Sequence, residues 1–141
     1  MNDIDVSQLG TKGEHIACIR LIDLGWEVVL GRLGSCDIVA EKNDKILRFQ
    51  VKSTKDVSKD KRTFDGRSNH YSFNLTSRGY GPKGQISREY SKNAFDYFAF
   101  VVLTIERVVF VNKQVITQKS KKTFKVNQFW YQANCPPKEL C

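Results

Sequence analysis

The sequence predicts an α/β domain in which a mixed central β-sheet is flanked by helices. Three observations favour this class: a helical segment at residues 12–25, two strands about a tight turn at 37–53, and a pair of apolar strands at 96–103 and 107–111. A chain of 141 residues is long enough to bury a core of its own. We therefore expect residues 1–141 to form a single domain.

The segment DIVAEKNDKILRFQVKS, residues 37–53, has the pattern of a β-hairpin. Asn43 and Asp44 tolerate the positive φ that a two-residue turn needs. If these two residues form the whole loop, Lys42 pairs with Lys45 across the turn. The register of every later pair then follows from this one.

In that register an acid, an amide and a lysine gather on one side of the hairpin. Asp37 faces Gln50, and Lys52 projects from the same side because it lies two residues further along the strand. The other side carries an apolar row suited to a core, made of Leu47, Phe49 and Val51. The hairpin therefore separates a polar side from a buried side.

The first helix is predicted at residues 12–25, KGEHIACIRLIDLG, with Thr11 as its N-cap and Gly25 at its end. Helical spacing turns Glu14 toward the same side as three small or apolar residues, which are Ala17, Cys18 and Leu21. A carboxylate on the inward side of a first helical turn suggests a functional role.

The remaining segments complete the expected order. Strands are predicted at 26–31 and 70–75. Polar or glycine-rich connections are predicted at 54–69 and 77–84, followed by a helix at 85–94. The aromatic trio near the end of the chain, Phe129-Trp130-Tyr131, is expected to be buried or to form a subunit contact rather than to stack on bases.

The charge balance points to a polyanionic partner. The chain has 23 Lys and Arg residues against 15 Asp and Glu residues, a formal net charge of +8. For so small a domain, such an excess is most often associated with nucleic acid, although a merely basic surface is the alternative.

Other compositional features indicate a cytoplasmic protein without a membrane span. No apolar run approaches the ~20 residues that cross a bilayer. The N-terminus, Met-Asn-Asp-Ile-Asp, lacks the basic and then apolar order of a signal peptide. The four cysteines (Cys18, Cys36, Cys135 and Cys141) show no CxxC spacing, which favours reduced thiols over disulfides or a zinc site.

The order of a helix with Glu14, a strand, Asp37 at the start of a hairpin and Gln50-Val51-Lys52 near its end resembles the PD-(D/E)xK nuclease superfamily. The resemblance covers residues 10 to 53 well and 96–103 loosely. Within the superfamily, the chain looks most like the group I intron-associated homing endonucleases, in which a QxK motif occurs. Archaeal Holliday-junction resolvases resemble it in layout.

This resemblance implies a restriction-endonuclease-like core and a catalytic set of Glu14, Asp37, Gln50 and Lys52. Mg²⁺, with Mn²⁺ as an alternative, would be held by oxygen atoms of Asp37, Gln50 and the Val51 backbone, with Glu14 binding the ion or one of its waters. Lys52 would orient or activate the attacking water, or stabilise the charge that develops on the phosphate.

Gln50 departs from the superfamily pattern, because most members have an acid at this position. The amide removes one negative charge and should weaken cation binding. A catalytically silent DNA-binding module is therefore an alternative to an active nuclease.

Several basic residues are candidate DNA contacts. Five follow the motif strand, and others lie near the glycine-rich connection and in the KSKK run, for which a plain solvated run is an equal alternative. They are Lys55, Lys59, Lys61, Arg62, Arg67, Arg78, Arg88, Lys121 and Lys122. We expect the segments 54–69 and 77–84 to be inserted loops that contact DNA.

Together these features predict a Mg²⁺-dependent, site-specific double-strand DNA endonuclease of the homing type, of bacterial or phage origin. Cutting both strands with one site per chain favours a homo-oligomer, a dimer or tetramer. A Holliday-junction resolvase or repair nuclease is the first alternative, and the silent binding module is the second.

Overall fold

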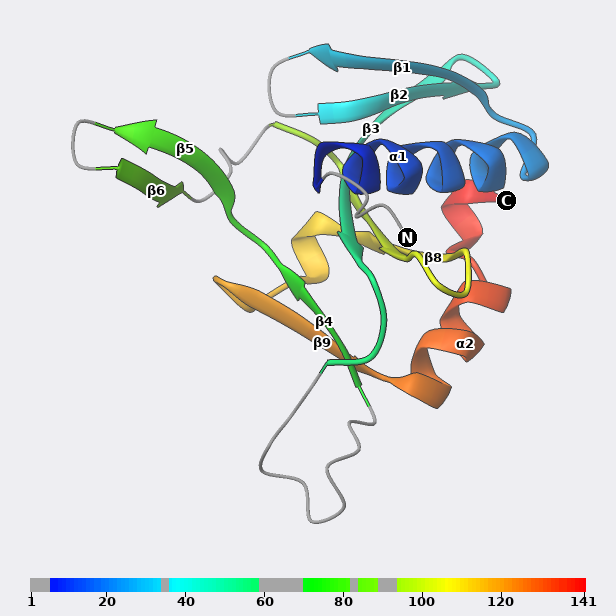
Figure 1. Cartoon of the computed structure of the whole chain (residues 1–141). Helices are drawn as coiled ribbons and strands as arrows, with labels where there is room; N and C mark the ends of the chain where they lie inside the picture. Colours follow the sequence, from blue (N-terminus) through cyan, green and yellow to red (C-terminus); the bar gives the residue numbers. More distant parts are fainter. Residues whose placement is uncertain (1–5, 34–35, 59–69, 82–83, 89–93) are drawn as a thin grey trace.

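The computed structural model of the chain describes residues 6–33, 36–58, 70–81, 84–88 and 94–141 (Figure 1). Its helices and strands follow one another as α1 (Val6–Asp23), β1 (Glu27–Leu33), β2 (Cys36–Lys42), β3 (Lys45–Thr54), β4 (His70–Asn74), β5 (Ser77–Gly81), β6 (Gly84–Arg88), β7 (Tyr97–Val102), β8 (Arg107–Asn112), the 3₁₀ turn η1 (Lys113–Val115), β9 (Lys121–Lys125), α2 (Val126–Asn134) and the 3₁₀ turn η2 (Lys138–Leu140).

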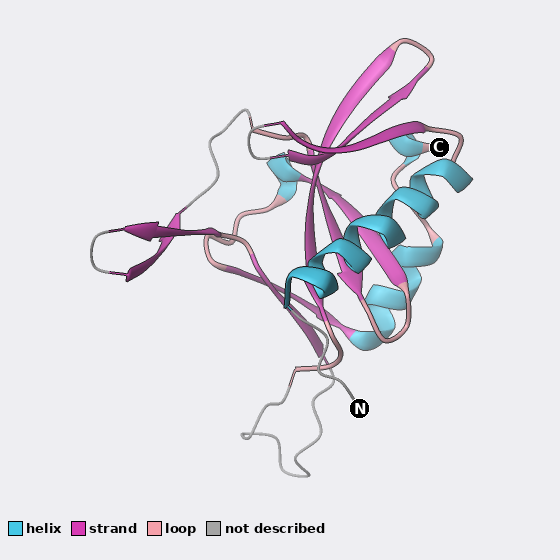
Figure 2. Cartoon of the chain, turned by 45° about the horizontal axis from the view of Figure 1, so that its top comes forward, coloured by secondary structure: helices cyan, strands magenta, loops and turns pink. Residues whose placement is uncertain are grey.

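The predicted mixed sheet flanked by helices is confirmed. Its five strands have the order β1-β2-β3-β7-β8. The pair β3–β7 is parallel, and the other three neighbouring pairs are antiparallel. Helix α1 lies along one face of this sheet (Figure 2). The other face packs against β4, β9 and α2. Of the aromatic residues on α2, Phe129 is fully buried as expected, whereas Tyr131 is 71% exposed. Neither helix of the described residues has the length and hydropathy needed to cross a bilayer.

Helix α1 begins six residues before the predicted start, at Val6. Thr11 lies inside the helix, so its prediction as an N-cap is wrong. Two glycines in the first half of the helix lower its intrinsic propensity, which made a later start plausible. Packing of Leu9 against the core overrides that propensity.

The predicted stop of α1 near Gly25 is confirmed. The last residue of the helix is Asp23. Gly25 has φ +94°, in the left-handed region that favours glycine. Trp26 N donates to Leu21 O at 3.0 Å and Gly25 N donates to Ile22 O at 2.9 Å. These two bonds are those of a Schellman motif, which satisfies carbonyls at the helix end.

The hairpin of β2 and β3 has the predicted register. Asn43 and Asp44 have φ 52° and 64°, and Lys42 pairs with Lys45. On the α1 side, the predicted apolar row of β3 is buried: Leu47, Phe49 and Val51. The alternate side chains of β3, which include Gln50 and Lys52, therefore point to the other face of the sheet, where β4, β9 and α2 pack.

The predictions for residues 77–84 and 85–94 are wrong in the described parts. Residues 77–81 and 84–88 are strands β5 and β6, which pair as an antiparallel hairpin closed by Gly81 opposite Gly84. Pairing with β5 satisfies backbone N–H and C=O groups of residues 84–88 without a helix. The segment also has no apolar stripe that would hold a helix on the core. Figure 1 shows this hairpin projecting from the sheet.

The predicted strand at 70–75 is β4, and its partner is β9, which includes Lys121 and Lys122 of the KSKK run. Between β3 and β4, Ser58 N donates to His70 O at 2.9 Å, so the two ends of the predicted 54–69 loop meet. Residues 59–69 lie outside the described part of the chain.

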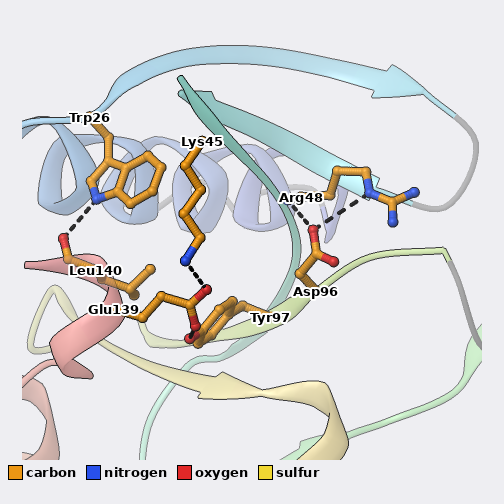
Figure 3. A network of polar contacts seen from close by, with 7 residues as sticks. All are labelled: Trp26, Lys45, Arg48, Asp96, Tyr97, Glu139 and Leu140. Atoms are coloured by element: carbon orange, nitrogen blue, oxygen red, sulfur yellow. Dashed lines mark hydrogen bonds and ion pairs between the residues drawn. The ribbon is translucent and has the colours of Figure 1, made fainter. Parts of the chain in front are cut away.

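The C-terminal turn η2 is tied to the sheet by polar contacts (Figure 3). Trp26 Nε1 donates to Leu140 O at 2.7 Å, and Lys45 Nζ lies 2.5 Å from a Glu139 carboxylate oxygen. The hydroxyl of Tyr97 donates to the same carboxylate. The pKa of Glu139 is lowered, first by the hydrogen bond from Lys45 and then by that from Tyr97. These contacts tie η2 to the start of β3 through Lys45 and to the start of β7 through Tyr97.

Gly13 is the point of close approach between α1 and β3. A Cβ at this position would lie 1.9 Å from Ser53 Oγ and 3.1 Å from Ser53 Cβ. Gly10, on the same helix, would meet nothing within 4 Å. The missing side chain of Gly13 thus lets the first half of α1 rest on the end of β3.

This difference predicts opposite effects for two substitutions in one helix. Gly10→Ala should stabilise the protein by up to about 1 kcal/mol, because alanine is the better helix former. Gly13→Ala should lose that gain or destabilise, because its Cβ collides with Ser53. The free energy of unfolding in urea measures both variants. Adding Ser53→Ala to Gly13→Ala should recover part of the loss, and equal gains from the two single variants would contradict close packing at Gly13.

Candidate active site

The centre of the candidate site is the Asp37 carboxylate on β2. Its Oδ2 atom accepts two hydrogen bonds from β3, one from Gln50 Nε2 at 2.8 Å and one from Val51 N at 2.9 Å. Gln50 is only 8% exposed and Asp37 is half-buried. The prediction that Asp37 and Gln50 lie side by side across the hairpin is therefore confirmed.

These two bonds fix how the Asp37 carboxylate and the Gln50 amide are oriented toward each other. Asp37 Oδ2 is engaged by two N–H groups, which fix the orientation of the carboxylate, and Oδ1 takes part in neither bond. The Gln50 amide uses its nitrogen toward Asp37, so its oxygen, the atom that can bind a cation, is the other end of the same planar group.

Lys52 reaches a segment far from it in sequence. Its Nζ donates to Thr76 O at 3.1 Å, and Thr76 lies between β4 and β5. Lys52 is half-buried and lies on the same side of β3 as Gln50. The sequence did not predict Thr76, because a backbone carbonyl acceptor leaves no signal in residue type.

Glu14 approaches the end of β3 from the α1 side of the sheet. Its neighbour Gly13 packs on Ser53, which follows Lys52 directly. Glu14 is half-buried, and its carboxylate adds to burial in raising the pKa of the Cys18 thiol to about 11. The inward direction predicted for Glu14 agrees with these contacts, while its role at the site stays a prediction.

The side chains that gather here are suited to a hard cation. In the described part of the chain, no three His, Cys, Asp or Glu side chains lie close enough to hold a metal ion. The predicted donors are instead one or two carboxylates, an amide oxygen and a backbone carbonyl, all oxygen atoms of the kind that Mg²⁺ prefers. All four cysteines are free thiols, two buried and two exposed.

The predicted DNA contacts fall on several elements. Lys55 is exposed just after β3, Lys121 is exposed on β9, and Lys122 Nζ lies 5.1 Å from the centre of the Phe124 ring. Arg78 and Arg88 belong to β5 and β6. The other four lie outside the described residues: Lys59, Lys61, Arg62 and Arg67.

Comparisons with known proteins agree with this architecture. A sequence profile described as PD-(D/E)XK endonuclease matches residues 4–129. A search of curated proteins finds no match. Among solved structures, the chain is similar to a bacterial homing endonuclease, I-Ssp6803I, with a TM-score of 0.70 and 22% sequence identity, over 86% of this chain and 78% of that one.

The profile spans most of the chain and includes all four residues of the predicted motif. The likeness in structure shows the same restriction-endonuclease-like fold. The chain belongs to the PD-(D/E)XK endonuclease family, whose members are metal-dependent nucleases that act on DNA.

Proposed function

We propose that the protein is a Mg²⁺-dependent, site-specific double-strand DNA endonuclease of the homing type. The observation that carries this proposal is the double hydrogen bond from β3 to Asp37 Oδ2, which holds a carboxylate and an amide side by side. The homing type is further supported by the structural similarity to a bacterial homing endonuclease.

In this proposal the ion is held by oxygen atoms of Asp37 and Gln50. The Val51 carbonyl is a further ligand, and Glu14 binds the ion or one of its waters. A divalent cation there would stabilise negative charge on the scissile phosphate and make a bound water easier to deprotonate. Mg²⁺ suits these oxygen donors, and Mn²⁺ is an alternative.

Lys52 acts on the water or the phosphate. The Thr76 carbonyl holds its ammonium group on the polar side of β3. From there the charge can orient the attacking water or stabilise the additional negative charge of the transition state. Both roles require the Lys52 ammonium group to stay near the position where Thr76 holds it.

The substrate contacts and the assembly follow from charge and symmetry. The segments 54–69 and 77–84 carry most of the proposed phosphate contacts, and Arg88 on β6 and Lys121 and Lys122 on β9 are the others. Cutting both strands with one active site per chain is most simply done by a symmetric homo-oligomer, a dimer or tetramer.

The first prediction separates cutting from binding. Asp37→Asn keeps an acceptor oxygen for the two N–H donors but removes the charge that would bind the cation. We expect cleavage in Mg²⁺ to fall by about 100-fold or more, as it does when a group that stabilises the transition state is removed. Duplex binding should be largely retained, since phosphate contacts elsewhere provide most of the affinity. Lys52→Ala should also lose cutting.

The measurement is cleavage of a plasmid library of random inserts, with sequencing of the cut ends. Asp23→Ala and Lys12→Ala are matched controls, because both side chains are exposed on α1 and neither belongs to the site. Cutting by the two site variants at the parent rate would show that the assignment is wrong. A parent protein that binds duplex DNA without cutting any sequence would support the silent binding module, and cutting of four-way junctions alone would support the resolvase.

The second prediction concerns the Gln50 amide. Gln50→Glu removes the donor to Asp37 and places two carboxylates at hydrogen-bond distance, where both cannot stay ionised without a cation. The variant should melt at a lower temperature than the parent in EDTA. Its melting temperature should rise more steeply with Mg²⁺, and the half-saturating Mg²⁺ concentration for cleavage should fall.

Gln50→Ala is the control, because it removes the donor and the oxygen ligand together. It should also melt lower in EDTA, but Mg²⁺ should stabilise it less than the parent. If the parent, Gln50→Glu and Gln50→Ala proteins all have the same half-saturating Mg²⁺ concentration, Gln50 does not bind the ion.

A further inference from the structure

A groove beside the candidate site carries two lysines that the proposed mechanism does not use. It has a volume of about 250 Å³ and lies between the end of β4, strand β7 and the segment that follows β8. In the described part of the chain its walls are formed by Leu75, Phe98, Lys113, Ile116, Thr117, Gln118 and Lys119, and none of these seven residues has a carboxylate.

The groove lies on the same face of the sheet as Gln50 and Lys52. Phe98 is the partner of Gln50 in the parallel pairing of β3 with β7, and its ring belongs to the core on that face. Leu75 precedes Thr76, whose carbonyl accepts the hydrogen bond from Lys52. The floor of the groove is thus continuous with the residues that hold the site.

The floor and rim differ in chemistry. Leu75 and Phe98 are each 4% exposed and form an apolar floor. Lys119 is exposed at the rim, while Lys113 is half-buried with its Nζ 4.4 Å from the centre of the Phe95 ring. This combination suits a ligand unit that has an apolar part and an anionic part.

The surroundings of Lys113 favour an anion. Its pKa is lowered, first by burial and then by the nearby Arg48 cation, while Asp96 acts in the opposite direction. Asp96 also lies 3.6 Å from Arg48 Nε, so one carboxylate is shared by two cations. A partly desolvated ammonium group in such surroundings gains from an incoming negative charge.

We propose that this groove binds one nucleotide unit of the DNA strand next to the scissile phosphate, with Lys113 and Lys119 on the phosphate and the deoxyribose on Leu75 and Phe98. The volume is below the roughly 300–1,000 Å³ of sites for small-molecule ligands, which fits one unit of a longer polymer. This inference rests on the proposed function, because it needs DNA at the neighbouring site.

The test is the salt dependence of DNA binding in EDTA, where no cleavage occurs. The probe is a mixed-sequence duplex of about 30 base pairs, titrated between about 50 and 200 mM salt. Lys119→Ala and Lys113→Met should each weaken binding and make the log–log slope shallower by about 0.9, the value for one lost phosphate contact. Methionine keeps an apolar chain over Phe95, and Lys119→Ala alters only an exposed residue.

Lys12→Ala removes the same charge from α1, on the opposite face of the sheet, and should leave the slope unchanged. If the groove variants have the same slope as Lys12→Ala while the parent still binds DNA, the groove does not contact a phosphate. That result would overturn this inference and leave the proposed function standing. A parent protein that does not bind the duplex would overturn both. If Lys113→Met does not fold, Lys119→Ala decides the outcome alone.

Discussion

The register of the β2–β3 hairpin is the constraint on which the candidate site depends. Successive side chains of a strand point to opposite faces, so a slip of β3 by one residue would turn Gln50 toward α1 and away from Asp37, and would turn Phe49 away from α1. The left-handed turn at Asn43 and Asp44 fixes the loop length, and burial of Phe49 fixes the face. The interactions that stabilise the core on the α1 side therefore also place the polar pair on the other side.

Those features that depend on neighbouring residues could be predicted from the sequence. The hairpin follows from its turn residues and alternation, and the end of α1 follows from Gly25, whose positive φ closes the helix. The contact between Asp37 and Gln50 follows from the same register. The start of α1 was missed, because packing on β3 outweighs the low propensity of Gly10 and Gly13.

Features that join distant segments could not be predicted. Strand β9 forms because β4 offers a partner about fifty residues earlier. The contact of Lys52 with Thr76 and the groove with Lys113 arise in the same way, since each depends on chain segments that only the fold brings together. The charges of these residues were visible, but their positions were not. The β5–β6 hairpin is a local pairing, and it was missed because its glycines favour a connection over a strand.

Gln50 connects the stability of the site with its chemistry. As a donor to Asp37, the amide holds the carboxylate in place without requiring a cation, and as an oxygen ligand it would complete the site when one binds. The most direct measurement is the anomalous diffraction of Mn²⁺ in crystals of the protein. We expect the ion to be bound directly by one oxygen each of Asp37 and Gln50, close to the distance of about 2.0–2.1 Å that Mg²⁺ takes with oxygen ligands. An ion bound elsewhere, or to Asp37 without the Gln50 oxygen, would contradict this account.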